Sequence, residues 1–369
     1  IILSHNIIAV YFVPIYILLC LMFVVLYEKK YLLNFSISTI LGIGISAFFW
    51  FPAIFEKKHI LLSVIPIADR SLYFVSFRDL IFPSWGYGIP TDGVTAFSYQ
   101  LGIGTIISLI GILGAIVYKL AQVEKTSPST KIATGFFLVS LFMILMMFSF
   151  TSFLWIRLPI LNEINYPWTL LAPIGFLISL LSGFVVSLKK ISRFVFLLIL
   201  VANAIIVIQY AKPASYIERN DEYYLTNLAT TTSSSELMPL WVKLIPKSQV
   251  GSKVEIVEGT GVVENIISKS NIVTFNVDLE KSSTIRINTV FYPGWKIFVN
   301  GQETSFSYNN LYGVMDLKLE RGKYLVVASF SETKPRMAAN MISLISVLVS
   351  VIILVSGLII MYKNHGKKK

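Results

Sequence analysis

Long apolar runs divide this chain into segments that cross a membrane and segments that do not. Seven runs reach about the 20 helical residues that a bilayer core of about 30 Å requires. They cover residues 6–27, 32–55, 101–120, 132–155, 168–188, 194–211 and 337–361. Within lipid, such runs must form helices, because backbone polar groups find no water there. The sequence therefore predicts a polytopic α-helical membrane protein.

Composition supports this class and excludes others. Hydrophobic residues make up 55% of the chain and charged residues 14%, which excludes an ordinary soluble globule. The formal net charge is +11, but the basic residues lie mostly at the ends of apolar runs, so we expect no nucleic-acid binding. Cys20 is the single cysteine, so no disulfide can form within the chain.

Basic residues are distributed unevenly among the short loops, and this sets the expected orientation. If the 28–31 loop is cytoplasmic, twelve basic residues fall in cytoplasmic segments. They are Lys29, Lys30, Lys119, Lys125, Lys131, Lys189, Lys190, Arg193, Lys363, Lys367, Lys368 and Lys369. The 156–167 loop on the opposite side holds only Arg157. By the positive-inside rule, we expect the 56–100 loop and the 212–336 block on the exterior face, with the C-terminal tail in the cytoplasm.

This orientation also places Ile1 on the exterior face. We therefore expect at least one further span upstream of Ile1. The apolar residues of the 56–100 loop predict one or two amphipathic helices in the membrane interface.

The polar block at 212–336 begins with a connector, residues 212–250. Its 217–228 segment favours a short helix, with acidic residues in the first turns. The Thr/Ser-rich stretch at 230–236 either caps a second short helix or belongs to a flexible linker.

The remainder of the block has the texture of a β-domain. Period-two runs predict eight strands, at 253–257, 261–268, 271–279, 283–290, 295–299, 303–308, 312–319 and 323–330. Asn300-Gly301 is a two-residue hairpin signal, since both positions of such a turn need a positive φ. We therefore expect a small antiparallel β-sandwich. The predicted division is a six-span bundle at 1–211, the connector at 212–250, the β-sandwich at 251–336, and a last span with a basic tail at 337–369.

Several motifs resemble one family. The sequence FYPGWKIFVNGQ at 291–302 resembles a hairpin of YfhO-like bacterial membrane proteins, which belong to the GT-C class of glycosyltransferases. Some relatives are labelled as 6-pyruvoyl-tetrahydropterin synthase-related membrane proteins. Further similar motifs follow in the family's order: SHN at 4–6, AFFWFPA at 47–53, RDLIFPSWGYG at 78–88, INYPW at 164–168, and E-x-x-P-x-W at 236–241.

The resemblance implies the C-terminal part of an enzyme in the bacterial cytoplasmic membrane. Such an enzyme would move a sugar from a polyprenyl-phosphate carrier to a cell-envelope glycan or glycolipid. Two features depart from the family. Thr169 stands where relatives often have an arginine, and the carboxylate usually assigned to catalysis would lie upstream of Ile1.

A lipid-phosphate donor requires a cation for the phosphate and a carboxylate to activate the acceptor hydroxyl. The donor-binding candidates are His5, Asn6, Lys57, Lys58, Arg70, Arg78, Tyr166 and Trp168. Each also has a structural interpretation. The basic cluster at 57–59 suits lipid headgroups, the Asp69-Arg70 and Arg78-Asp79 pairs suit solvated loop charges, and the aromatic residues suit an interfacial belt.

The catalytic carboxylate is unassigned, with Glu163, Glu236 and Asp69 as weak candidates. With three histidines and one cysteine, the sequence shows no zinc-type cluster. It indicates no cofactor, and a requirement for a divalent metal stays open. Two other functions remain: a membrane-anchored glycan-binding or envelope-assembly protein, and a transporter of lipid carriers or polysaccharide. Transport ranks last, because the apolar runs contain few polar side chains.

Overall fold

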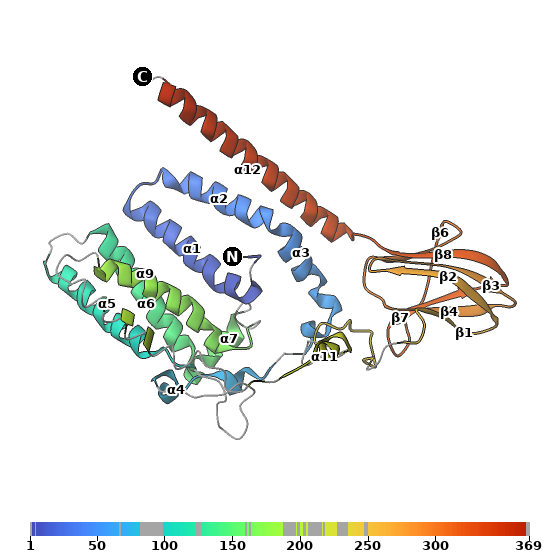
Figure 1. Cartoon of the computed structure of the whole chain (residues 1–369). Coiled ribbons are helices and arrows are strands. Elements are labelled where there is room, and N and C mark those ends of the chain that lie inside the picture. The colour runs from blue at the N-terminus through green and yellow to red at the C-terminus, as the bar shows by residue number, and fades with distance from the viewer. Residues whose placement is uncertain are drawn as a thin grey trace. The chain divides into compact units, whose positions relative to one another are not determined.

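The computed structural model describes residues 2–3, 5–65, 68–81, 99–122, 127–158, 161, 164–186, 197, 200–201, 204–205, 216, 218–226, 235–246 and 250–366 (Figure 1). The chain forms two compact units. Unit 1 contains Ile1–Ile40 and Ala68–Glu218, and unit 2 contains Leu41–Ile67 and Arg219–Lys369.

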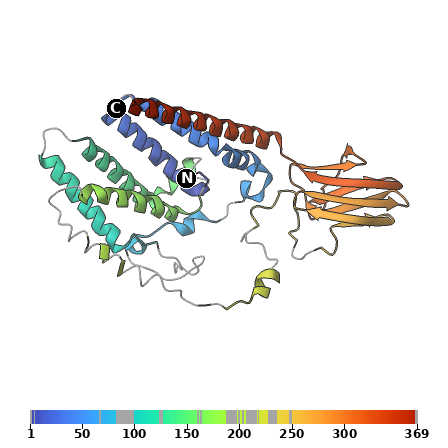
Figure 2. The same cartoon turned by 45° about the horizontal axis from the view of Figure 1, so that its top comes forward.

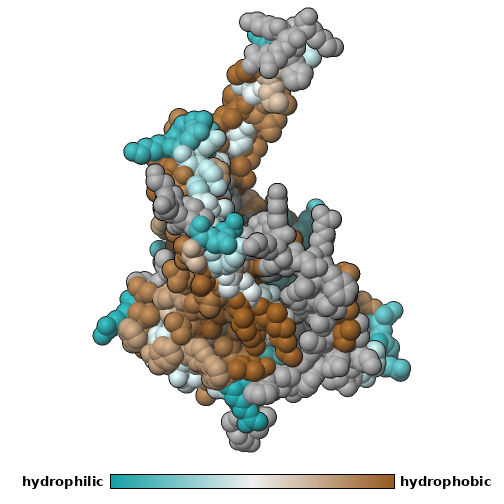
Figure 3. Space-filling model, turned by 90° about the vertical axis from the view of Figure 1, so that its left-hand side faces the viewer, coloured by the Kyte–Doolittle hydropathy of each residue, from teal (hydrophilic) through white to brown (hydrophobic). Residues whose placement is uncertain are grey.

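Among the described residues, five helices are long and apolar enough to cross a membrane. They are Ile8–Leu26, Ile103–Gln122, Pro128–Met146, Pro167–Val186 and Lys334–Lys363. A sixth candidate is the pair Tyr31–Ile45 and Ala47–His59, which is bent by 63°. The predicted run at 194–211 lies mostly outside the described residues. Figure 3 shows extensive apolar surface on the helices, as expected for a membrane protein.

Unit 1 is a helical bundle around one core. Its helices are α1 (Asn6–Leu26), α4 (Phe77–Ile81), α5 (Ile103–Gln122), α6 (Pro128–Met146), α7 (Ser152–Arg157) and α9 (Leu171–Val186). Short 3₁₀ turns are η3 (Arg70–Tyr73), η4 (Ser149–Thr151) and η5 (Pro167–Leu170). The core contains Tyr11, Ile112, Phe136, Trp155 and Leu177. Within the predicted interfacial loop, η3 and α4 are short helical pieces, and α4 contributes Leu80 to this core.

The predicted span at 132–155 is shorter in the structure, because α6 ends at Met146. The Met146 carbonyl accepts hydrogen bonds from the Thr151 hydroxyl at 3.1 Å and from the Trp155 indole at 2.9 Å. These bonds satisfy a carbonyl that has no partner within the helix. The chain turns there and continues as η4 and α7.

Helices α2 (Tyr31–Ile45) and α3 (Ala47–Glu56) cover the span predicted at 32–55, with a break between them. The helix breaks at Ser46, and α12 (Lys334–Gly366) provides hydrogen bonds at the break. The Ser343 hydroxyl accepts a hydrogen bond from the Phe48 N–H at 2.8 Å and donates one to the Gly44 carbonyl at 3.1 Å. Figure 1 and Figure 2 both show α12 alongside α3. A neighbouring serine thus satisfies the backbone groups that the break exposes.

The β-domain follows the predicted strands closely. They are β1 (Val254–Glu258), β2 (Gly261–Lys269), β3 (Ile272–Leu279), β4 (Ser283–Val290), β5 (Trp295–Val299), β6 (Gln302–Thr304), β7 (Val314–Leu319) and β8 (Gly322–Phe330). The strand predicted at 303–308 is shorter, since only a single bridge, Ser307 to Asp316, follows β6. Asn300 and Gly301 have φ values of 49° and 84°, so the predicted hairpin turn is confirmed.

Two antiparallel sheets pack around a shared core. One has the order β1-β4-β7 and the other β2-β3-β8-β5-β6. Alternate residues from both sheets fill the core, among them Phe275, Ile285, Ile297, Leu317 and Val326. This two-layer arrangement is that of a β-sandwich.

The described residues of the connector include a short helix, α11 (Asp221–Thr226), within the segment predicted to be helical. The Thr/Ser-rich residues 230–234 lie outside the described residues. Residues 235–246 form turns and a β-bridge between Ile60 and Pro239 rather than a second helix.

Candidate functional site

Arg70 begins a 3₁₀ turn that Asp69 caps. The Asp69 carboxylate accepts a hydrogen bond from the Ser71 N–H at 2.9 Å, as a helix-capping residue does. Hydrogen bonding to Ser71 lowers the pKa of Asp69. The Asp69 side chain is exposed, and its observed role is to fix the start of η3.

Arg70 itself is half-buried within unit 1. Its Nε donates a hydrogen bond to the Ile164 carbonyl at 2.8 Å, and its guanidinium lies over the Trp155 ring at 5.7 Å. Burial lowers the pKa of Arg70, opposed by the charge of Tyr11. The guanidinium group of arginine keeps its charge in proteins, so the fold holds a positive charge over the Trp155 ring.

Aromatic side chains continue from this point. Tyr73 meets Tyr166 edge-on, with ring centroids 4.8 Å apart. Tyr166 lies 5.9 Å from Trp168, which stacks on Tyr99 at 6.1 Å. Burial raises the pKa of Tyr99 to about 12, with smaller contributions from Tyr73 and Asp79. Tyr166 and Trp168, which the sequence places at the membrane interface, thus join a packed aromatic row.

Thr169 connects this row to α1. Its hydroxyl lies 2.7 Å from the Tyr11 hydroxyl and donates to the Tyr166 carbonyl at 2.6 Å. Tyr11 in turn interacts electrostatically with Arg70. The Arg70 cluster, as we call it, therefore consists of Tyr11, Arg70, Tyr73, Tyr99, Trp155, Tyr166, Trp168 and Thr169.

A second polar group lies in unit 2, where α3 meets α12. Glu56 accepts a 2.6 Å hydrogen bond from Arg336 and a 3.1 Å bond from the Thr333 hydroxyl. The two charged side chains are 12% and 14% exposed. The Arg336 guanidinium also lies over the rings of Phe330, at 4.9 Å, and Tyr292, at 5.6 Å. This ion pair ties the start of α12 to the end of α3.

Aromatic residues extend the contact into the β-domain. Burial raises the pKa of Tyr292, and the nearby Glu56 carboxylate adds to the effect. The His59 ring lies 6.3 Å from Tyr292 and 6.1 Å from Trp241. The Trp241 indole donates to the Phe291 carbonyl at 3.1 Å. The FYPGW and E-x-x-P-x-W motifs therefore meet each other and His59.

Backbone pairing fixes the 57–59 cluster in this place. The Leu240 N–H donates to the His59 carbonyl at 2.9 Å, and the Leu62 N–H donates to the Glu236 carbonyl at 2.8 Å. Lys57 is half-buried and Lys58 exposed within the turn η1 (Lys57–His59). Glu236 is half-buried. Unit 2 thus brings Lys57, Lys58 and Glu236 into one region.

The other predicted residues have separate positions. His5 is exposed at the start of α1 in unit 1, and Asn6 is the first residue of that helix. Arg78 is exposed on α4, whereas Asp79 accepts a 2.6 Å hydrogen bond from the Ser76 hydroxyl. Glu163 lies outside the described residues.

Sequence reasoning missed the Glu56–Arg336 pair and the role of Tyr11. Glu56 directly follows the run at 32–55, and Arg336 directly precedes the run at 337–361. Opposite charges at the ends of two apolar runs are a signal for pairing, because an unpaired charge near the hydrocarbon is costly. The signal for Tyr11 is weaker, since tyrosines are common in such helices.

The described part of the chain contains no cluster of three His, Cys, Asp or Glu side chains placed to hold a metal ion. The Arg70 cluster combines the half-buried Arg70 cation with the half-buried rings of Tyr166 and Trp168, whereas the rings of Tyr73, Tyr99 and Trp155 are buried. These groups suit a ligand that combines a phosphate with an apolar chain. Comparison of the chain with protein-family models, with curated proteins and with solved structures found no match.

Proposed function

We propose that this chain is the C-terminal part of an integral-membrane glycosyltransferase of the GT-C class, related to YfhO-like proteins. It uses a polyprenyl-phosphate-linked sugar to modify a cell-envelope glycan or glycolipid on the exterior face of a bacterial cytoplasmic membrane. The β-domain lies on the exterior face, and the lysine-rich tail is cytoplasmic.

The observation that carries this proposal is the half-buried Arg70 guanidinium within the aromatic residues of the Arg70 cluster. Arginine recognises phosphate through several donors in a planar array, and a partly desolvated site strengthens that interaction. The half-buried rings of Tyr166 and Trp168 provide apolar contact for the first isoprene units and a stacking surface for the sugar. Thr169, directly after the motif at 164–168, stands where relatives often have an arginine. Arg70 supplies the cation in its place.

The test uses the full-length protein, with its native upstream sequence, reconstituted into liposomes. Transfer of radiolabelled sugar from a polyprenyl-phosphate donor to envelope glycan is compared for the wild type, Arg70→Lys, Arg70→Ala and Arg78→Ala. We expect Arg70→Ala to lower transfer at least a hundredfold, Arg70→Lys to retain part of it, and Arg78→Ala to match the wild type.

A binding measurement separates a donor contact from a structural role. Trp155 lies under Arg70, so quenching of tryptophan fluorescence by polyprenyl phosphate reports on the cluster. Wild-type transfer by a folded Arg70→Ala protein would disprove the assignment of Arg70. Absence of transfer from every polyprenyl-phosphate sugar tested, with the native upstream sequence present, would disprove the proposed function.

A further inference from the structure

A groove lies on the outer face of the β1-β4-β7 sheet, within unit 2. Its volume is about 880 Å³, within the range of about 300–1,000 Å³ that is common for ligand sites. The floor consists of strand residues, and one wall is formed by the connector residues Leu244, Ile245 and Pro246. None of the residues that line this groove belongs to the Arg70 cluster.

The floor is polar because of strand alternation. Val254 on β1, Ile285 on β4 and Leu317 on β7 point into the sandwich core. The residues next to them along each strand therefore point outward. Glu255 pairs with Arg286 across β1 and β4, and Arg286 pairs with Asp316 across β4 and β7. Three charged side chains therefore form one row across the sheet.

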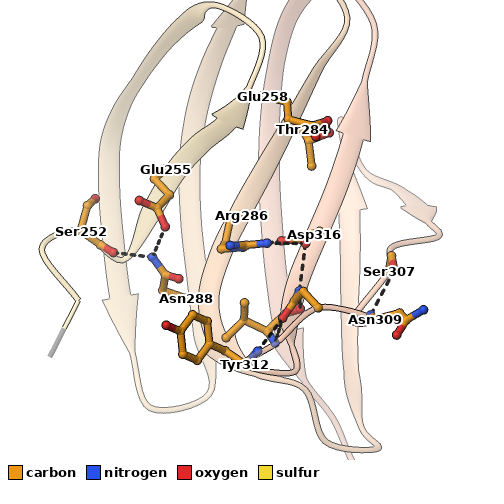
Figure 4. A network of polar contacts seen from close by, with 12 residues as sticks. Ser252, Glu255, Glu258, Thr284, Arg286, Asn288, Ser307, Asn309, Tyr312 and Asp316 are labelled. Carbon is orange, nitrogen blue, oxygen red and sulfur yellow. Dashed lines mark hydrogen bonds and ion pairs between the residues drawn. The ribbon is translucent and has the colours of Figure 1, made fainter. Parts of the chain in front are cut away.

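This row and its neighbours are held rigidly by hydrogen bonds (Figure 4). Arg286 makes two bonds of 2.8 Å to the Asp316 carboxylate. The Asn288 amide donates to Glu255 at 3.0 Å and to the Ser252 carbonyl at 2.9 Å. A floor that is already ordered loses little conformational entropy when a ligand binds.

The charges of the floor balance. The charged residues that line the groove are Lys253, Glu255 and Arg286. Arg286 is neutralised by its two hydrogen bonds to Asp316, which is not one of the lining residues, so Lys253 and Glu255 remain as one positive and one negative charge. A phosphate or another anion would meet the Glu255 carboxylate, and one of the two cations is already paired with Asp316, so the groove favours an uncharged ligand. The face also differs from a peptide-binding edge, because peptides that extend a sheet pair with an unpaired strand edge.

A sugar suits the remaining features. Its hydroxyl groups need donors and acceptors side by side, and Asn288, Arg286 and Glu255 supply both. Its C–H faces need apolar or aromatic surface, which Tyr312 and Val250 supply at the margins of the groove. Tyr312 is 37% exposed, and Figure 4 shows its ring beside Asn288.

We propose that this groove binds an uncharged glycan of one to a few sugar units. Its use as the acceptor site rests on the proposed glycosyltransferase function, whereas sugar binding itself does not. Binding and transfer are therefore measured separately.

The probes are neutral gluco- and N-acetylglucosamine oligosaccharides of three to six units, with polyprenyl phosphate in vesicles and an acidic oligosaccharide for comparison. Binding to the full-length protein in nanodiscs is measured by saturation-transfer NMR and calorimetry. We expect a neutral oligosaccharide to bind, and Tyr312→Ala and Asn288→Ala each to weaken it at least tenfold. Tyr216→Ala is the matched control, since Tyr216 is 86% exposed and distant in sequence from the groove.

Glu255→Gln provides a second variant with little change in shape, in case truncation disturbs the sheet. Failure of every neutral oligosaccharide to bind, or unchanged binding by folded Tyr312→Ala and Asn288→Ala, would overturn the proposal. So would binding of the acidic probe or polyprenyl phosphate alone. If the groove variants lose sugar binding but keep sugar transfer, the groove is not the acceptor site of the transfer reaction. Sugar binding without any sugar transfer would support the proposed sugar site and contradict the proposed enzymatic function.

Discussion

The Ser343 hydroxyl lies 2.8 Å from the backbone nitrogen of Phe48, although 295 residues separate them in the chain. The same hydroxyl donates to the Gly44 carbonyl, so one side chain serves both sides of the break between α2 and α3. Because few alternative partners exist in an apolar environment, this contact fixes where α12 packs on the broken helix.

Replacing Ser343 by alanine removes both hydrogen bonds and leaves two backbone groups unsatisfied. We expect a loss of about 1–2 kcal/mol in stability. Ser350→Ala is the matched control, since its hydroxyl bonds to its own helix at the Ser346 carbonyl. The free energy of unfolding in detergent checks the prediction, and equal losses in the two variants would contradict it.

Gly44 and Gly42 are expected to respond differently to alanine. A Cβ at Gly44 would overlap the Ser346 Oγ, whereas a Cβ at Gly42 has nothing within 4 Å. We expect Gly44→Ala to cost about 1–3 kcal/mol through overpacking, and Gly42→Ala to be neutral or stabilising. Thermal unfolding measures both. Adding Ser346→Ala to Gly44→Ala should recover part of the loss, and no recovery would argue against this steric explanation.

The Glu56–Arg336 pair should show strong coupling. Removing one partner leaves the other charge largely buried, which costs about 3–5 kcal/mol for a fully buried pair and less here. We expect Glu56→Gln and Arg336→Met each to destabilise the protein, and the double variant to be less destabilised than the sum. Denaturant unfolding of all four proteins gives the coupling energy. Additive losses would mean that the two side chains act independently.

The raised pKa of Tyr99 predicts a loss of stability at alkaline pH. Its pKa is raised from 10.0 to about 12, because burial disfavours the phenolate. Below about pH 10 the residue is neutral in both the folded and the unfolded protein. Its contribution is lost as pH rises from about 10 to 12, where the unfolded chain ionises first.

Unfolding of the wild type and Tyr99→Phe between pH 8 and 12 tests this dependence, with tyrosinate absorbance recorded in parallel. The variant should lose less stability than the wild type above pH 10. Identical slopes in the two proteins would show that Tyr99 titrates normally.

The β-domain could be predicted strand by strand because its signals are local. Period-two alternation places Ile285 and Ile287 in the core, and Asn300-Gly301 sets the hairpin turn. The break at Ser46 could not be predicted in the same way. Gly42, Gly44 and Ser46 are all tolerated in continuous spans, and the break depends on Ser343, which is remote in the sequence.

The candidate site also contains features with local sequence signals and features that depend on long-range contacts. The sequence indicated Arg70, Tyr166 and Trp168, but only the fold shows that they share a cluster with Tyr11 and Trp155. The capping role of Asp69 depends only on neighbouring residues, since an acidic residue before a short helical turn is a common cap. Long-range contacts within a bundle leave no comparable pattern in one sequence.

The length of α12 matters for the bilayer around it. Its 33 residues span about 50 Å at 1.5 Å each, against a hydrocarbon thickness of about 30 Å. Such a helix must tilt or extend beyond the hydrocarbon, and lipids of different chain length would change that balance. With Arg336 bound to Glu56 at one end, hydrophobic mismatch becomes a mechanical load on this ion pair.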